Sequence, residues 1–235
     1  MSSNNGNPDY NGTGEPEDVL RWALSEFHPD IALAASFENT VLIDMLTRIR
    51  PDIRVFSIDT GRLPEETFQC VAEAEQRFNI RVEWYFPDYQ RLEQLVRGKG
   101  VYSFRDSLEA RRSCCHIRKV EPLNRALSGL RAWITGLRRD EAESRRDVQV
   151  VSRDEAHGGI IKICPLAHWT GQQILDYTRE HKLPYNRLSE RNYTSIGCAC
   201  CTRPVEPGED ARAGRWWWEE SEHKECGLHI SNWQI

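Results

Sequence analysis

The chain has 235 residues, 39% of them hydrophobic and 29% charged, which suits one globular domain of generous size, alone or with an appended subdomain. Its formal net charge of -5 argues against a general nucleic-acid binder. Basic residues nevertheless concentrate at 111–119, 137–146 and 203–215, and such local patches suggest a small anionic ligand.

Cysteine content and the first residues indicate a reduced, cytoplasmic protein. Eight cysteines in a chain of this length are too few for a disulfide scaffold. The N-terminal residues contain neither the basic segment nor the apolar run of a secretion signal. No apolar stretch approaches the roughly 18 residues of a membrane span, so we expect a soluble protein that does not bind membranes.

Residues 1–16 are polar and rich in Asn, Gly and Pro, and with so little apolar surface we expect them to form a disordered leader. From Glu17 onward, helical patterns alternate with short apolar runs. The expected strands are 31–35, 53–58, 80–86, 132–135 and 160–163. The expected helices include one that Ser36 caps and that runs through Leu46, and those at 65–78, 89–96 and 171–181.

Continuously apolar strands that alternate with helices predict an α/β fold with a parallel sheet covered on both faces. In such a sheet ligands bind beyond the carboxyl ends of the strands, which here are followed by 35–37, 59–62 and 135–139. Hydroxyls and backbone amides at these places can hold a phosphate, and the arginines can neutralise it. None of them is a strong motif alone, because Ser36 can be an ordinary helix N-cap and 59–61 an ordinary turn.

Two adjacent cysteines, Cys114 and Cys115, lie inside the basic run 111–119. Adjacent cysteines do not readily bond to each other, and on a helix their side chains point about 100° apart. A second group of thiols lies at 198–201, where Cys198 is followed by Cys200 and Cys201. Four thiolates from the two groups can bind zinc or an iron–sulfur cluster.

The spacing favours a [4Fe-4S] cluster over zinc, because neighbouring cysteines diverge and reach different corners of a larger object. Such a cluster carries negative charge, which nearby arginines and Lys119 would offset. Spacing alone leaves two ligand choices in the second group, Cys198 with Cys200 or Cys198 with Cys201. Two buried structural cysteines beside a solvated basic run are the alternative to a metal site.

The residues after 202 differ in character from the rest of the chain. Three consecutive tryptophans at 216–218 cannot all face one core. We expect some of them to cover a ligand or another segment, and anchoring in the core is the alternative. Cys226 stands apart from the other thiols, with basic residues nearby that favour a nucleophilic thiolate and two glutamates that oppose it. Cys70 and Cys164 are interpreted as buried structural thiols.

Four segments together resemble the assimilatory sulfonucleotide reductases, and more narrowly the adenylyl-sulfate (APS) reductases. They are CCHIRKVEPL at 114–123, SIGCACCT at 195–202, GRWWW at 214–218 and ECGLH at 225–229. Residues 59–62, 135–136 and 183–186 fit the same family, so the resemblance runs from about residue 30 to 230. It implies a parallel-sheet PP-loop fold of the adenine nucleotide α-hydrolase-like type, with a [4Fe-4S] site and a mobile C-terminal tail.

The resemblance also implies a domain organisation and a ligand set. Residues 17–202 would form the nucleotide- and cluster-binding α/β domain, and 203–235 a tail that carries the nucleophile Cys226. The cluster ligands would be Cys114, Cys115, Cys198 and Cys201. Members of the family with both cysteine pairs generally prefer APS, whereas those that lack them use 3′-phospho-APS (PAPS).

The implied reaction is the thioredoxin-dependent reduction of APS to sulfite and AMP in sulfate assimilation and cysteine biosynthesis, through an S-sulfocysteine on Cys226. His229 would assist Cys226, and a homo-oligomer is expected. Cations should stabilise the reacting anions, and those assigned to the phosphosulfate are Lys119, Arg146, Arg212 and Arg215. The residues assigned to the adenosine are Ala35, Ser36, Ile58, Thr60 and Gly136.

Two features depart from the family pattern. Residues 35–40 lack the Ser-Gly-Gly that many PP-loop proteins contain, and Cys200 is an extra thiol. The alternatives are a PAPS or dual-specificity reductase, a PP-loop ATP pyrophosphatase such as an RNA thiolation enzyme, and a non-catalytic iron–sulfur protein. The missing Ser-Gly-Gly and the ECGLH segment argue against the second.

Overall fold

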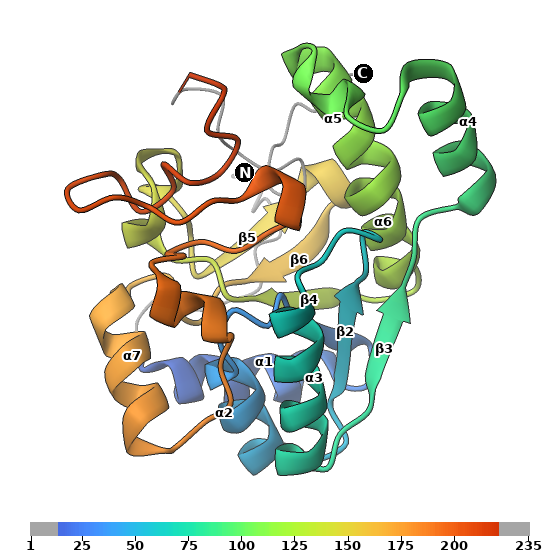
Figure 1. Cartoon of the computed structure of the whole chain (residues 1–235). Helices are drawn as coiled ribbons and strands as arrows, with labels where there is room; N and C mark the ends of the chain where they lie inside the picture. Colours follow the sequence, from blue (N-terminus) through green and yellow to red (C-terminus); the bar gives the residue numbers. More distant parts are fainter. Residues whose placement is uncertain (1–13, 221–235) are drawn as a thin grey trace, which may run out of the picture.

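The structure is a computed structural model that describes residues 14–220. Within these residues, six strands form one sheet. The strand order is β3-β2-β1-β4-β6-β5 (Figure 1). All neighbours are parallel except β5 and β6. The strands are β1 (Ile31–Ala34), β2 (Arg54–Ile58), β3 (Val82–Tyr85), β4 (Ala132–Thr135), β5 (Val151–Asp154) and β6 (Ile160–Ile163).

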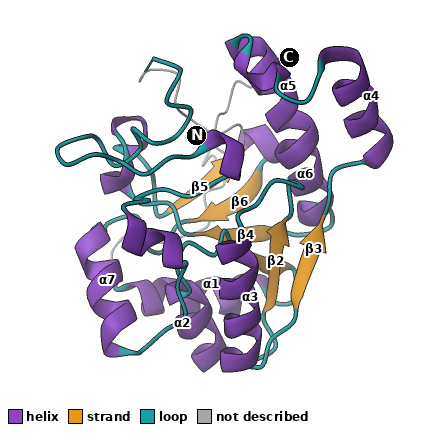
Figure 2. Cartoon of the chain, viewed as in Figure 1, coloured by secondary structure: helices purple, strands orange, loops and turns teal. Residues whose placement is uncertain are grey.

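Helices cover both faces of the sheet, as Figure 2 shows. One face packs against α1 (Pro16–Phe27), α2 (Val41–Ile49), α3 (Glu65–Phe78) and α7 (Gly171–Glu180). The other face packs against α6 (Glu121–Leu127), which follows α5 (Leu108–Cys115), while α4 (Tyr89–Lys99) contributes no buried residue.

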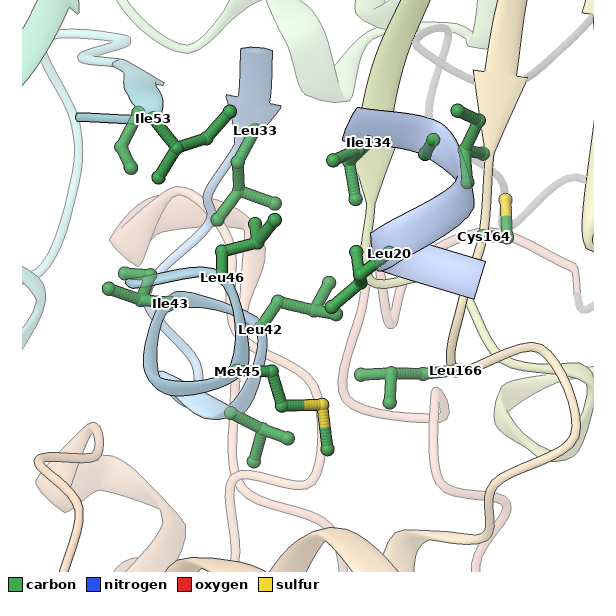
Figure 3. Packing of buried hydrophobic residues seen from close by; sticks show 14 of the residues in the cluster. Leu20, Leu33, Leu42, Ile43, Met45, Leu46, Ile53, Ile134, Cys164 and Leu166 are labelled. Carbon is green, nitrogen blue, oxygen red and sulfur yellow. The ribbon is translucent and has the colours of Figure 1, made fainter. Parts of the chain in front are cut away.

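The two cores follow from the alternation of side chains along each strand. Leu33 pairs in register with Val55 and Ile134, and all three belong to the larger core with residues of α1 and α2 (Figure 3). Their neighbours Ala32, Phe56 and Trp133 face the opposite side, where they pack against Leu123, Ala126 and Leu127 of α6. A sheet that is buried on both faces favours strands that are mostly apolar, and the sequence predicted such strands.

The predicted α/β class and the predicted strands and helices are confirmed, with two corrections. The sheet is mostly rather than wholly parallel, because β5 was missed and runs antiparallel to β6. Ser36 does not cap α2, which begins at Val41 after Thr40. Residues 36–40 form a loop instead, in which Phe37 has a φ of 56°. Within residues 14–220, no helix is both long and apolar enough to cross a membrane.

The segment that carries the first cysteine pair changes its helical winding twice. Ser107 caps α5 by accepting a hydrogen bond from the backbone N–H of Ala110 at 3.1 Å. The helix then passes into the π-helical turn η2 (His116–Val120) and continues as α6, with Pro122 in its first turn. Turns of this kind change which side chains face inward and are frequent at functional sites. Here Cys114 and Cys115 are buried before the turn and Arg118 and Lys119 within it.

Candidate active site

A cavity of about 220 Å³ lies at the carboxyl ends of the central parallel strands. Eight residues that the sequence analysis assigned to the substrate line this cavity. They are Ala35, Ser36, Ile58, Thr60, Lys119, Gly136, Arg212 and Arg215. Apolar side chains from both cores, among them Leu33, Phe56 and Trp133, line it as well. The cavity therefore combines an apolar part with a cationic one.

Arg212 and Arg215 form part of the cationic wall and are almost fully buried. Their Nη1 atoms share one acceptor, Ser195 Oγ, at 3.3 Å and 3.1 Å. Arg215 also donates to the carbonyl of Ile196 at 3.1 Å, whereas its buried Nε has no hydrogen-bond partner among the described residues. Two buried guanidinium groups that meet at one hydroxyl form a cationic wall that can bind an anion.

Gly197 makes room for this arrangement. A Cβ atom at this position would lie 2.3 Å from Nη2 of Arg215 and 2.6 Å from its Cζ. The guanidinium therefore packs directly against the glycine backbone. A glycine that precedes the second cysteine group thus serves the cationic wall.

Arg146 does not reach the cavity. Its side chain is 71% exposed and pairs with the equally exposed Glu143. The neighbouring Arg145 is buried instead, lines the cavity and pairs with Glu141. Two short 3-10 turns, 139–141 and 143–145, determine which of the two adjacent arginines points inward. The basic run 137–146 was recognised in the sequence, and Arg146 was assigned from it, but it is Arg145 that lines the cavity.

Sequence reasoning missed Glu141 and Glu38, which line the cavity, and it named Arg138, which lines it too, only among the arginines that follow the strand 132–135. Arg138 pairs with Glu141 at 3.2 Å and with Asp140 at 3.1 Å. Burial raises the pKa of the Glu38 carboxyl above its usual range, and Glu141 adds to this effect. Arg215, the backbone N–H of Ile196 and Arg212 oppose it. No spacing signal marked Glu38, which lies in the loop between β1 and α2.

A second, smaller cavity adjoins the first, and four thiols line it. Cys114 and Cys115 come from the end of α5, while Cys198 precedes the short turn η7 (Ala199–Cys201) and Cys201 ends it. The other lining residues are Arg62, Phe104, Arg111, Arg118, Lys119 and Trp216. We call this space the thiol cavity. The structure thus brings together the four cysteines that the sequence analysis assigned to a cluster.

Two residues connect the thiol cavity with the larger one. Lys119 lines both cavities. Thr60 lines the larger cavity, and its Oγ1 lies 3.2 Å from Cys198 Sγ. Nη1 of Arg118 donates to the Thr60 carbonyl at 2.5 Å, and this contact passes close to Gly61, whose φ is 68°.

Burial outweighs the nearby cations at Cys114, so the pKa of its thiol is raised above the ordinary value. The cations that oppose this rise in pKa are Arg118 and Arg62. Among the described residues, no group of three or more His, Cys, Asp or Glu side chains is arranged to hold a single metal ion. The four thiols are instead distributed around the thiol cavity.

The remaining described cysteines lie outside the thiol cavity. Cys200 is partly exposed, and its Sγ accepts from Nη1 of Arg62 at 3.7 Å. Cys70 and Cys164 are 2% and 1% exposed, and burial raises the pKa of each thiol to about 12. Their prediction as buried thiols is confirmed.

The three tryptophans take different positions, as expected. Trp216 is buried and lines the thiol cavity, Trp217 is 38% exposed, and Trp218 packs against Phe104 with ring centroids 5.9 Å apart. Their segment joins the domain through a bridge between Thr202 and Arg215. Cys226 and His229, the assigned nucleophile and its helper, lie outside the described residues.

Comparison with known proteins gives a consistent result. The model of the phosphoadenosine phosphosulfate reductase domain family matches residues 30–204. An adenosine 5′-phosphosulfate reductase of Pseudomonas aeruginosa (strain LESB58) is 44% identical over 223 residues, which cover 92% of this chain and 83% of that protein. A second such reductase, from Burkholderia cepacia, is 41% identical over 226 residues, which cover 95% of this chain and 90% of that protein.

A solved structure agrees with these sequence matches. The crystal structure of phosphoadenylyl-sulfate (PAPS) reductase from Candida auris, in a phosphate complex, superimposes with a TM-score of 0.69 at 29% identity. The match covers 82% of this chain and 91% of that one.

Proposed function

Because the chain belongs to the phosphoadenosine phosphosulfate reductase family, we propose that it reduces adenosine 5′-phosphosulfate through a covalent intermediate, with thioredoxin as the electron donor. It is an APS reductase, an oxidoreductase of sulfate reduction, by its likeness to the bacterial reductases. One observation carries the assignment at the level of the site. The cavity at the strand ends joins apolar walls to buried cations, and it adjoins the thiol cavity.

The two parts of the cavity match the two parts of the substrate. We assign the adenosine to the strand ends, where Ala35, Ser36, Ile58, Thr60 and Gly136 meet apolar walls. The phosphosulfate is assigned to Lys119, Arg212 and Arg215, since buried guanidinium groups bind such anions with charge-assisted hydrogen bonds. Arg138 and Arg145 extend the same cationic wall.

The proposed chemistry divides the reduction into two displacements. The Cys226 thiolate attacks the sulfur of APS, the bond between sulfur and the phosphate oxygen breaks, and AMP leaves with the electron pair. A thioredoxin thiolate then attacks Cys226 Sγ, sulfite leaves, and a mixed disulfide forms. The second thioredoxin thiol resolves it, which leaves oxidised thioredoxin and the free Cys226 thiolate. His229 is proposed to assist Cys226.

The thiol cavity fits a [4Fe-4S] cluster by the chemistry of its donors. Such a cluster takes one cysteine thiolate per iron, and Cys114, Cys115, Cys198 and Cys201 line one buried space. Arg62, Arg111, Arg118 and Lys119 line the same space and would offset the negative charge of a thiolate-bound cluster. When bound, the cluster would supply fixed charge beside Lys119, since thioredoxin provides both electrons.

The domain organisation is proposed on the same basis. Residues 17–202 hold the nucleotide and the cluster, and 203–235 contribute Arg212, Arg215 and the nucleophile. The described part of this tail is packed on the domain through its buried arginines and Trp216. Mobility of the tail, a homo-oligomeric assembly and a cytoplasmic location stay predictions. Protection of residues 205–235 from a protease by AMP or APS would support a tail that closes over the ligand.

The deciding experiment is anaerobic sulfite release by the purified protein with thioredoxin, with APS and PAPS compared at equal concentration. We expect a strong preference for APS. Comparable rates would make the protein a dual-specificity enzyme, and sulfite from neither substrate would contradict the proposal. Cys226→Ser is the matched control, which should bind AMP but release no sulfite.

A further inference from the structure

The residues beside the thiol cavity form an exposed aromatic surface that the proposed chemistry does not use. Its members are Val101, Tyr102, Arg105, Trp217 and Trp218, which we call the aromatic patch, and the buried ring of Phe104 packs against Tyr102 and Trp218. Val101, Tyr102 and Trp217 are 55%, 60% and 38% exposed. Single apolar residues on a surface are ordinary, but several at one place indicate an interaction site.

Arg105 lies at the centre of this patch. Its guanidinium carbon lies 5.2 Å and 5.4 Å from the ring centroids of Tyr102 and Trp217. It lies 5.7 Å and 5.1 Å from those of Phe104 and Trp218. Its Nη2 also donates to the Cys200 carbonyl at 3.2 Å.

These contacts hold the exposed side chains in a defined arrangement. Arg62 donates to the Val101 carbonyl at 2.6 Å and thereby fixes the loop before Tyr102. Tyr, Trp and Arg are the residues that most often dominate the binding energy of protein interfaces, in part because little entropy is lost when rigid side chains are buried. The patch therefore has both the composition and the rigidity of a docking site for another protein.

The position of the patch indicates which protein docks there. The second half of the proposed reaction requires a dithiol protein to bring its thiolate to the sulfur of Cys226. Cys226 follows Trp217 by nine residues, which span at most about 30 Å of extended chain. The tail that carries the modified cysteine thus leaves the described structure directly beside the patch. A reductant held on the patch is within reach of its target.

We propose that the aromatic patch is the docking surface for the protein dithiol that reduces the S-sulfocysteine, an inference that rests on the proposed function. The partner presents apolar side chains around its reactive cysteines, and these cover Val101, Tyr102 and Trp217. The thiolate of the docked partner displaces sulfite from Cys226 Sγ. Its second thiol then releases the enzyme as the thiolate and leaves the partner oxidised.

The test separates the two half-reactions in the cluster-loaded protein. The S-sulfo enzyme is first formed with APS and monitored by AMP release and intact mass, and sulfite release is then timed with thioredoxin or with dithiothreitol. For Tyr102→Ser we expect the second-order rate constant with thioredoxin to fall about tenfold. AMP release and the rate with dithiothreitol should not change, because a small dithiol needs no docking surface.

A matched control keeps the interpretation specific. Tyr89 is another exposed tyrosine, 71% exposed at the start of α4, and Tyr89→Ser should leave all three rates unchanged. Val101→Ser, which removes a different exposed member of the patch, should reproduce the loss with thioredoxin.

Three outcomes would overturn the inference. Unchanged rates with thioredoxin in both Tyr102→Ser and Val101→Ser would mean that the patch does not bind the reductant. Equal losses with thioredoxin and dithiothreitol would assign the patch to positioning the tail, and a change in oligomeric state with unchanged rates would assign it to contact between copies. Failure of the unmodified protein to form the S-sulfo enzyme would instead refute the proposed function itself.

Discussion

Arg111 and Glu219 form a buried ion pair, in which Arg111 Nε donates to Glu219 Oε1 at 2.6 Å with side chains that are 1% and 9% exposed. The pair joins α5 to the segment after the tryptophans, and the Arg111 guanidinium also lies 4.5 Å from the Trp216 ring centroid. Removal of one partner leaves a buried charge uncompensated, which typically costs about 3–5 kcal/mol. Glu219→Ala should therefore lower the free energy of unfolding by about that amount in urea denaturation.

The exposed pair of Arg203 and Glu209 is the control for that experiment. The two side chains are 33% and 31% exposed, and Nη2 of Arg203 lies 2.7 Å from Oε1 of Glu209. Surface pairs of this kind contribute at most about 1 kcal/mol to the free energy of unfolding. Glu209→Ala should therefore have a small effect. Equal losses in the two variants would show that burial of the Arg111–Glu219 pair has no energetic importance.

Gly197→Ala should weaken substrate binding. The new methyl group would overlap the Arg215 guanidinium at 2.3 Å and displace it from the cavity wall. Loss of a charge-assisted hydrogen bond costs about 1.5–3 kcal/mol, so we expect KM for APS to rise by about 10-fold to 150-fold. Gly98→Ala is the control, because nothing lies within 4 Å of a Cβ there. An unchanged KM in Gly197→Ala would argue against a role for Arg215 in binding.

Arg145 and Arg146 are neighbours in sequence with opposite environments, and their alanine variants should differ accordingly. Arg145 is buried and lines the cavity, so Arg145→Ala should lower kcat/KM for APS by tenfold or more. Arg146 is exposed and pairs with the exposed Glu143, so Arg146→Ala should change kcat/KM by less than about twofold. Steady-state kinetics with both variants checks the structural choice, and the reverse order would restore Arg146 to the site.

Cys200 and Cys201 provide a comparable pair for the thiol cavity. Cys201 lines the cavity and Cys200 does not. Anaerobically purified Cys201→Ala should therefore lose iron and visible absorbance, whereas Cys200→Ala should keep both. Iron content per protein and the absorbance spectrum measure this without reference to activity. Retention of iron in Cys201→Ala and its loss in Cys200→Ala would reassign the fourth ligand.

Glu38 makes the stability of the ligand-free protein depend on pH. The pKa of its carboxyl is raised in the folded state above the ordinary 4.5, so folding favours the neutral form. The stability that the neutral form contributes is therefore lost as pH rises. Glu38→Gln cannot ionise. The variant and the unmodified protein should thus be similar in melting temperature near pH 4, and the variant should be the more stable at pH 7. A difference that does not depend on pH would contradict the assignment.

The sequence predicted the architecture where the pattern was local and complete. Parallel strands such as 132–135 are buried on both faces and read as uninterrupted apolar runs, so they were placed correctly. β5 was missed because only its two ends are buried, as expected of an edge strand. Its pairing with β6 depends on a tight turn that includes Gly158 and Gly159, both with positive φ.

The site was predicted less evenly. The strand-end residues and the thiols could be assigned because their spacing or their resemblance to a family fixed them. Arg145 could not be distinguished from Arg146, because a 3-10 turn decides which of two adjacent side chains faces inward. Glu38 gave no signal either, since its importance arises only from its neighbours in space, Glu141, Arg212 and Arg215.

The π-helical turn between α5 and α6 has a consequence for sequence length. A π-helical turn winds more slowly than an α-helix, so the five residues of this one cover about the same rotation as four α-helical residues. The turn therefore takes up one extra residue while Cys114 and Cys115 face their cavity and Leu123 and Leu127 face the sheet. A chain that lacked one residue between Cys115 and Pro122 could wind the stretch as a plain α-helix and keep both sets of side chains in place.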